Sequence, residues 1–196
     1  MLKLGVIIEI NLPKVDKKII EINNKFSIRH YSYLPPHISI YIWESNNELN
    51  NIVKKIKTIT KSFDRFYIKI NKLNFSKYHT IQLKVSKNPI LNKFHKIIIE
   101  EMSKYRDKTA PSKTKEFYPS FNEEERKLID KFGRLNILNN FEPHITLEKF
   151  PVELTQKIKE FLSDFKPKFN IEIKEVSLLE IKKDNYKTIK KIKLNI

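Results

Sequence analysis

The sequence predicts an α+β fold in which two pseudo-symmetric lobes of antiparallel sheet, with helices on the outside, enclose a central cleft. Along the 196 residues, short strand-like runs are interspersed with amphipathic helical runs, a pattern typical of α+β domains. A Pro-His-Ile-Ser/Thr run occurs twice, at 36–39 and 143–146, and each copy precedes an amphipathic helix and a pair of strands. Such an internal repeat predicts two related lobes. Because no low-complexity linker separates them, we expect one domain over 1–196.

Hydrophobic periodicity defines the elements of the first half. Apolar runs and period-two alternation predict strands, and apolar residues spaced three to four apart predict helices. Pro13 opens the first helix, because proline favours the first helical turn. The spacing of Ser45 and Glu48 is that of a capping box at the start of the second helix. The expected strands are 4–10, 37–43, 66–75 and 80–85, with helices after residue 12 and after residue 48.

The second half follows the same order but contains an irregular segment. Pro89 and Pro151 each open a helix, and strands are expected at 144–150, 169–181 and 188–194. Over 103–140 the pattern weakens, although a charged helix is expected at 123–132. Long irregular segments in compact domains are usually functional or disordered. We therefore interpret 103–140 as an insertion or lid.

The composition excludes several kinds of chemistry. Without cysteine, the chain has no disulfide, no thiolate metal site and no cysteine nucleophile. With only two glycines, it has no glycine-rich phosphate loop. No apolar run approaches the roughly 18 residues of a membrane span, and the first residues lack the pattern of a signal peptide. We therefore expect a cytoplasmic protein with no membrane partner.

The formal net charge of +16 permits an anionic partner without requiring one. Most of the cations are lysines. Lysine, isoleucine and asparagine share A/T-rich codons, so nucleotide bias alone could supply many of them. Proteins that recognise phosphate often favour the bidentate fork of arginine. Charge alone therefore leaves nucleotide or nucleic-acid binding open.

The repeated motif carries the chemistry that the composition leaves available. Side chains alternate between the faces of a strand, so His37 shares a face with Ser39, and His144 shares a face with Thr146. If a two-fold axis relates the lobes, both pairs line one cleft. A neutral imidazole can take a proton from an attacking oxygen while an imidazolium gives one to the leaving oxygen. The hydroxyls can donate to nonbridging phosphate oxygens, so this set suits phosphodiester chemistry without a metal.

Three side chains near the motifs are further candidates. Alternation from the histidines places Tyr41 and Glu148 on the cleft face. There Tyr41 could stack on a base or simply pack at the rim. Arg134 lies near the second motif and could help to neutralise phosphate.

The three other histidines lie outside such motifs. We expect His79 in a hairpin loop and His95 on a helix surface, while His30 stays undecided. The chain has no His-x-x-x-His pair and no cysteine, and carboxylates do not cluster beside the motifs. We therefore expect no metal and no cofactor.

The doublet HISI at 37–40 and HITL at 144–147 resembles the paired His-x-Thr/Ser motifs of the two-histidine (2H) phosphoesterase superfamily. This superfamily includes the 2'-5' RNA ligase-like proteins and the cyclic nucleotide phosphodiesterases. The approach to the second motif, 132–134 and 141–144, looks like the family's lead-in. The resemblance implies a two-lobed α+β fold with both motifs in a central cleft. It implies metal-free action on 2',3'-cyclic phosphates, 2'-5' linkages or RNA ends, with His37 and His144 catalytic and with Ser39 and Thr146 binding phosphate.

Two features depart from the family pattern. The separation between the motifs is long for the family, and the excess falls in 103–140. Ser39 stands where threonine is common, a small change because both hydroxyls donate the same hydrogen bond. These departures put the choice of substrate in question more than the chemistry.

We therefore expect a metal-independent phosphodiesterase for a nucleotide or RNA that carries a cyclic phosphate or phosphodiester, and we favour a monomer. A non-catalytic RNA- or nucleotide-binding module of the same fold is the main alternative. An enzyme of unrelated fold, such as a phosphatase, in which the doublet is a coincidence, is a third. The sequence does not separate hydrolysis from ligation or exonuclease trimming, and it does not assign acid and base to the two histidines.

Overall fold

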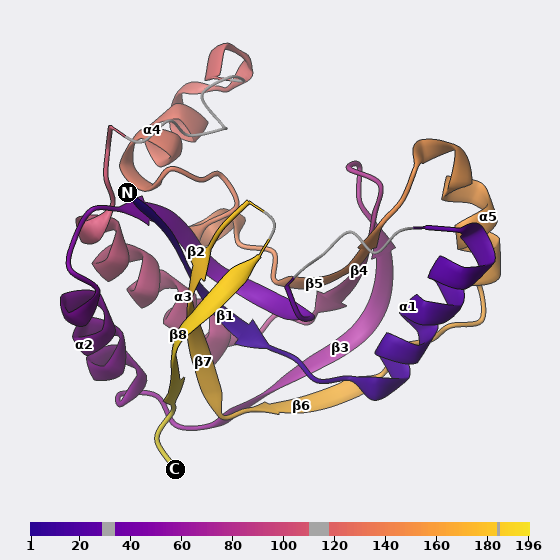
Figure 1. The fold of residues 1–196 in the computed structure, drawn as a ribbon, viewed down its shortest axis with the longest axis horizontal. Coiled ribbons are helices and arrows are strands. Elements are labelled where there is room, and N and C mark those ends of the chain that lie inside the picture. Colours follow the sequence, from indigo (N-terminus) through magenta and orange to yellow (C-terminus); the bar gives the residue numbers. More distant parts are fainter. Residues whose placement is uncertain (29–33, 110–117, 184) are drawn as a thin grey trace.

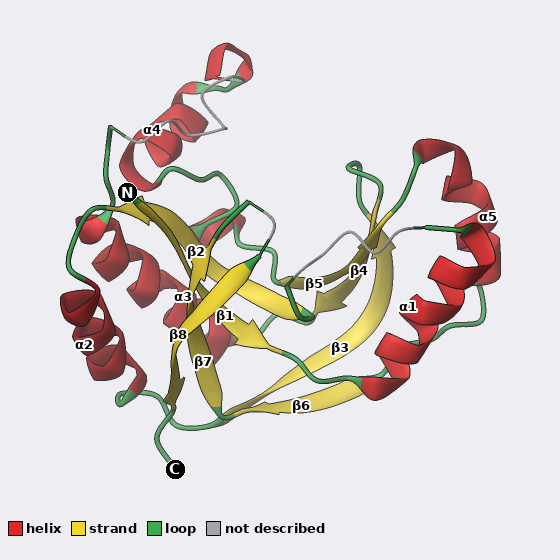
Figure 2. Cartoon of the chain, in the orientation of Figure 1, coloured by secondary structure: helices red, strands yellow, loops and turns green. Residues whose placement is uncertain are grey.

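The computed structural model describes residues 1–28, 34–109, 118–183 and 185–196, so His30 lies outside the described residues. The described strands form one antiparallel sheet in the order β6-β3-β4-β5-β2-β1-β7-β8, which curls into an open half-barrel (Figures 1 and 2). The strands are β1 (Leu2–Glu9), β2 (His37–Ser45), β3 (Phe66–Phe75), β4 (Thr80–Val85), β5 (His144–Lys149), β6 (Phe169–Ile173), β7 (Glu175–Ile181) and β8 (Tyr186–Lys193).

The sheet consists of two four-stranded halves that meet where β2 pairs with β5. That junction is a single pair of residues, Ile38 and Ile145. One half is β2-β1-β7-β8 and the other is β5-β4-β3-β6. The predicted α+β fold with two related lobes is therefore confirmed, and each lobe carries one of the two motifs at its inner strand.

The two halves of the sheet are not the two halves of the chain. The β3–β4 hairpin follows the first motif in sequence, yet it extends the half-sheet of the second motif. Likewise β7 and β8 extend the half-sheet of the first motif. The strand expected over 169–181 is in fact two strands that meet at Lys174, because β6 pairs with β3 and β7 pairs with β1. This run crosses from one half of the sheet to the other.

The helices cover one face of the sheet and leave the other face for the cleft. In Figure 1, α2 (Leu49–Thr60) and α3 (Pro89–Met102) flank the β2 half, and α1 (Pro13–Phe26) and α5 (Thr155–Phe161) flank the β5 half. The apolar faces of these four helices join one core with alternate strand residues, such as Val6 and Ile8 of β1. Ile7, between them, belongs to a small separate cluster on the opposite face.

Helix α2 begins at Leu49, as predicted, but the expected capping box of Ser45 and Glu48 is wrong. Ser45 ends β2, and its hydroxyl donates to the Tyr105 carbonyl at 2.7 Å instead of capping α2. Glu48 occupies the N-cap position of α2 without a side-chain cap. The hydroxyl of Ser45 is bound instead to the segment that follows α3, a tertiary contact that local spacing does not show. A capping box does form at Asn122, at the start of α4 (Glu123–Phe132).

The irregular segment 103–140 is docked on the β2 half where it is described. It contains 3-10 turns at Ser103–Tyr105 and Leu138–Asn140, and helix α4 lies between these two turns, as predicted. The α4 side chains Ile129 and Phe132 are buried. The Arg106 guanidinium also donates to the Asp130 carbonyl in the last turns of α4. Residues 110–117 lie outside the described part, and a lid role for this segment stays a prediction.

Candidate active site

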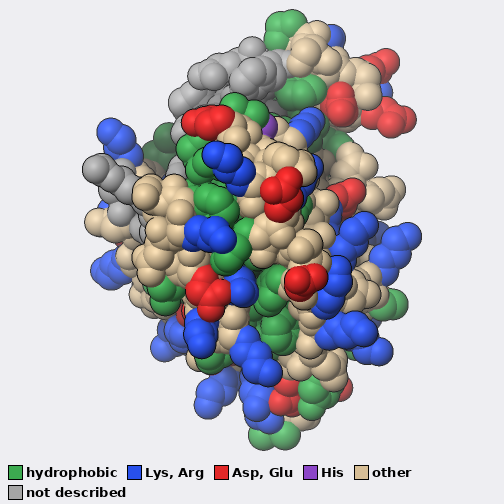
Figure 3. All heavy atoms as spheres, turned by 90° about the vertical axis from the view of Figure 1, so that its right-hand side faces the viewer, with side chains coloured by type: hydrophobic (Ala, Val, Ile, Leu, Met, Phe, Trp, Pro, Cys, Tyr) green, Lys and Arg blue, Asp and Glu red, His purple; other side chains and the backbone are tan. Residues whose placement is uncertain are grey.

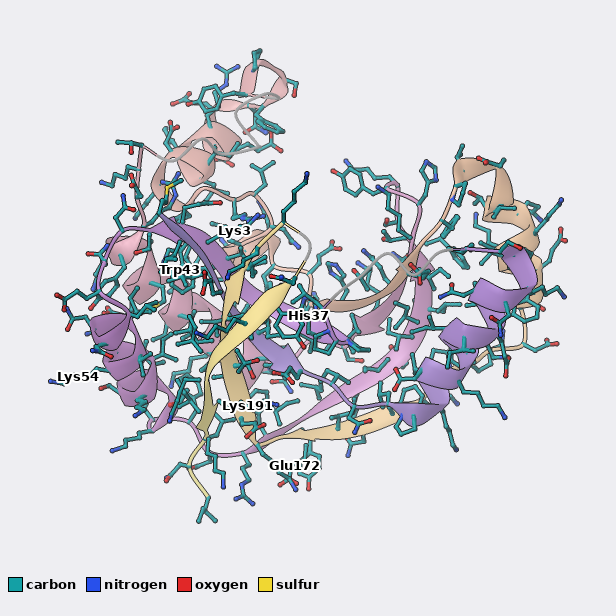
Figure 4. All side chains as sticks on the ribbon, in the orientation of Figure 1. Lys3, His37, Trp43, Lys54, Glu172 and Lys191 are labelled. Atoms are coloured by element: carbon teal, nitrogen blue, oxygen red, sulfur yellow. The ribbon has the colours of Figure 1, made fainter. Side chains whose placement is uncertain are left out.

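The register of β2 against β5 brings the two motifs together. Because Ile38 and Ile145 are partners in an antiparallel pair, His37 lies opposite Thr146 and Ser39 lies opposite His144. All four side chains share one face, and directly opposite Cβ atoms in such a pair are about 5 Å apart. They line one cavity of about 190 Å³. Figure 4 places His37 near the middle of the molecule, where the two halves meet.

The same backbone contact holds both imidazoles. Nδ1 of His37 lies 2.7 Å from the Pro35 carbonyl oxygen, and Nδ1 of His144 lies 2.8 Å from the Glu142 carbonyl oxygen. A carbonyl oxygen only accepts, so each Nδ1 carries a proton and each Nε2 is the atom that exchanges protons. Nε2 of His37 lies 3.1 Å from the Ser39 hydroxyl, on the cavity face.

The environment of His37 favours its neutral form. Burial lowers the pKa of His37 below its ordinary 6.5, the hydrogen bond to Pro35 opposes this, and the nearby His144 lowers the pKa further. A neutral imidazole with an unprotonated Nε2 is a proton acceptor at neutral pH. His37 is therefore suited to act as a general base.

Two charged residues flank the histidines on the neighbouring strands. In the strand register, Glu9 of β1 lies opposite His37, and Lys84 of β4 lies opposite His144. Burial raises the pKa of Glu9, but hydrogen bonds from Ser177 and Lys191 more than offset this, so Glu9 is an anion. Sequence reasoning missed both flanking residues, because only the strand register shows that they are neighbours of the motifs.

Matched β-bulges follow the two motifs. In β2 the extra residue is Ile40, and in β5 it is Leu147, the fourth residue of each motif. A bulge turns the following side chain to the other face of the sheet. The expectation that simple alternation holds for Tyr41 and Glu148 is therefore wrong, and both lie on the helix-covered face, 2% and 1% exposed.

Because of the bulge, the Tyr41 side chain packs in the core and contacts Phe132 and Trp43. Its hydroxyl donates to the Phe132 carbonyl at 2.8 Å, and its ring stacks on Trp43 with 5.2 Å between centroids. Glu148 accepts instead from the Asn23 amide on α1. Tyr41 borders the cavity, but its ring is not available to stack on a base, so the packing alternative describes it.

Arg134 lies in the cavity wall, in the segment that follows α4. Its Nε donates to the Ile42 carbonyl at 3.2 Å, and burial lowers its pKa. An arginine nevertheless stays cationic at neutral pH. The segment 103–140 thus supplies a half-buried cation beside the motifs, and its role toward phosphate stays a prediction.

His95 is a core residue and not the surface residue that was expected. It is 1% exposed, its Nδ1 donates to the carbonyl of the bulge residue Ile40 at 2.9 Å, and its Nε2 accepts from the Leu138 amide at 3.0 Å. Its ring stacks on Phe141, and burial lowers its pKa to about 4. His95 ties β2 to the cavity wall at 138–141. Its spacing from the apolar residues of α3 was the available signal, since it lies four residues after Leu91.

The other sequence expectations have these outcomes. His79 lies in the turn between β3 and β4, as predicted. Over the described ranges, no three His, Asp or Glu side chains come together as a metal site. No helix of the described residues has both the length and the apolarity to cross a membrane.

Solved structures with this fold are known. A crystal structure described as a phosphoesterase is 12% identical, with full coverage of both chains and a TM-score of 0.55. The E. coli LigT complexed with 3'-AMP is 11% identical, covers 100% and 98% of the two chains and gives a TM-score of 0.56. TT0787 of Thermus thermophilus is 14% identical over 98% of both, with a TM-score of 0.55. At these identities the likeness shows the fold alone, that of a LigT-like two-histidine phosphoesterase.

A sequence profile identifies the family. Residues 13–185 match the profile of the 2'-5' RNA ligase superfamily. The match covers most of the chain, so the chain belongs to that family. A search of curated proteins found no match.

Proposed function

We propose that the protein is a metal-independent phosphodiesterase that acts on a 2',3'-cyclic phosphate or a 2'-5' phosphodiester of a nucleotide or RNA end. The family description names RNA ligation at 2'-5' linkages. The LigT neighbour has been crystallised with 3'-AMP, NADP⁺ and ATP, which are all nucleotides. These matches support a phosphate-bearing nucleotide as the substrate class.

One observation carries the proposal. His37 and His144, from the two halves of the sheet, face one cavity with the same Nδ1-to-carbonyl hydrogen bond and therefore the same exposed nitrogen. The hydroxyls of Ser39 and Thr146 alternate with them across the strand pair. A phosphate placed between the imidazoles can thus receive hydrogen bonds from both hydroxyls.

In hydrolysis of a cyclic phosphate, two proton transfers accompany one displacement. The neutral imidazole takes a proton from water as the water oxygen bonds to phosphorus. The bond from phosphorus to one ribose oxygen breaks, and the imidazolium protonates that oxygen. The products are a phosphomonoester and a free hydroxyl, and the lowered pKa of His37 favours His37 as base and His144 as acid. Ligation uses the same two transfers in the opposite direction.

The test is a panel of nucleoside 2',3'-cyclic phosphates, 2'-5' dinucleotides and short RNAs with cyclic ends. Wild type should convert at least one of them, with and without EDTA, and phosphorus NMR of the products identifies the bond that breaks. His37→Ala and His144→Ala should each lower turnover by about 10²–10⁴-fold while circular dichroism shows an unchanged fold. Turnover at the wild-type rate in either variant contradicts the proposal. Salt-sensitive RNA binding without any turnover favours the non-catalytic module instead.

A further inference from the structure

A second hollow adjoins the catalytic cavity and is lined by lysines. It lies between the end of β4, one side of α3 and the segment 138–143, with a volume of about 980 Å³. Phe141, Glu142 and Pro143 line both hollows, so the two lie next to each other. We call this hollow the lysine groove. It contains four lysines and two carboxylates: Lys84, Lys87, Lys93, Lys96, Glu100 and Glu142.

The lysines of the groove are only partly neutralised. Lys84 pairs with Glu142 at 2.6 Å, but the i,i+4 pair of Lys96 with Glu100 is long, at 3.9 Å, and exposed. Such exposed pairs contribute little. Within the described ranges, Lys87 and Lys93 form no ion pair. Several like charges around one hollow repel one another, so an anion that bridges them is favoured.

The lysines of the groove form a row that leads away from the catalytic cavity, as the phosphates of a bound nucleic-acid chain would. Lys84 lies opposite His144 in the strand register and marks the border with the catalytic cavity. Lys87 follows at the end of β4, and Lys93 and Lys96 lie three residues apart on one face of α3. Phe141, packed on the ring of His95, gives the floor an aromatic surface. Cations in a row beside an aromatic surface are the features that bind single-stranded nucleic acid.

We propose that the lysine groove binds the sugar–phosphate backbone of an RNA chain whose reacting phosphodiester lies at His37 and His144. This proposal rests on the proposed function and narrows its substrate class from any nucleotide to an oligonucleotide. The groove lysines bind and orient the chain and do not touch the reacting atoms. Lys93 and Lys96 line the lysine groove and not the cavity that holds the two histidines, so we expect a mononucleotide bound at the histidines to make no contact with them.

The rest of the positive charge supplies a matched control. Figure 3 shows lysines and arginines spread, with interspersed carboxylates, over the side of the molecule that carries α1 and α5. Three exposed lysines of and just after α2, Lys54, Lys57 and Lys61, lie outside the lysine groove, and Figure 4 places Lys54 at the outer edge of the molecule, far from His37. Replacing these three with glutamine removes the same charge as replacing Lys87, Lys93 and Lys96.

The binding experiment uses fluorescence anisotropy with a labelled single-stranded RNA about 10 nucleotides long that ends in a 3'-phosphate. The triple variant Lys87→Gln, Lys93→Gln, Lys96→Gln should bind this RNA roughly tenfold more weakly than wild type at moderate salt. The slope of log affinity against log salt should become less negative by about 2, as expected for three lost phosphate contacts. The α2 triple variant should change affinity less than about twofold.

The catalytic readout separates this proposal from the proposed function. The groove triple should raise KM for an RNA with a 2',3'-cyclic end and leave turnover of a nucleoside 2',3'-cyclic phosphate unchanged. Equal weakening by the two triples, or no weakening by either, overturns the groove proposal. If no substrate is turned over, the proposed function fails, while the anisotropy measurement still decides whether the groove binds RNA.

Discussion

Backbone carbonyl groups hold both imidazoles, those of His37 and His144, in the same way. Each donates from Nδ1 to the carbonyl of the residue two positions earlier, Pro35 or Glu142. Proline follows each of these carbonyl residues and keeps the chain extended at that point. The Pro-His element of the motif therefore fixes the tautomer, which explains why the proline is part of both copies.

The proposed role of His37 as the base predicts how activity depends on pH. If His37 is the base, kcat/KM falls as the pH drops through its pKa, and burial lowers that pKa, so the acidic limb should lie below pH 6.5. The charge of Glu9 raises the pKa of His37, so Glu9→Gln should move the limb to still lower pH. The measurement is kcat/KM against pH for both proteins. If Glu9→Gln leaves the acidic limb of the kcat/KM profile unchanged, then a group other than His37 is the base.

His95 should make stability depend on pH. Its pKa is about 4 in the folded protein and 6.5 in the ordinary unfolded environment, so between these values the unfolded chain binds more protons. Stability should therefore fall as the pH drops from 6.5 to 4, by up to about 3 kcal/mol. His95→Gln keeps hydrogen-bonding groups but does not titrate, so it should remove that part of the decrease. Urea unfolding across this pH range checks it, and identical slopes for the two proteins contradict it.

Among the strands and helices, the sequence predicts which face of the sheet a side chain occupies before each of the two bulges but not after it. Periodicity located the helices and most strands, and the shared face of His37 and Ser39 follows from two-residue alternation alone. The bulges at Ile40 and Leu147 depend on pairing with β1 and β4, which no local pattern records. Tyr41 was therefore assigned to the wrong face, and Glu148 with it.

Tyr41 should contribute to stability and not to substrate affinity. Tyr41→Phe removes the donor to the Phe132 carbonyl and leaves that buried oxygen unpaired, at a cost of about 1–2 kcal/mol. KM for any substrate should stay within about twofold. Tyr78→Phe, at a tyrosine that is 68% exposed, is the control and should change neither quantity. A large rise in KM with unchanged stability in Tyr41→Phe would place its ring back in the cleft.

Across the molecule, each of the two motifs lies in a half-sheet made of strands from both halves of the chain. The hairpin after the first motif supports the second motif, and the strands after the second motif support the first. The repeat predicted two lobes. It did not predict that the strands after each motif join the half-sheet of the other motif, because strand pairing is set by tertiary packing. The same limit applies to Glu9, Lys84 and the lysine groove, whose members come from separate elements. The net charge of +16 alone located none of them.

If His37 and His144 act as one unit on one phosphodiester, a double-mutant cycle of kcat/KM shows it most directly. His37→Ala and His144→Ala should each lower kcat/KM by about 10²–10⁴-fold, because each removes one of two coupled proton transfers. The double variant should then lose little more than either single variant, since the remaining histidine cannot complete the reaction alone. Losses that multiply in the double variant, or a single variant with wild-type kcat/KM, would contradict the joint action of the two histidines.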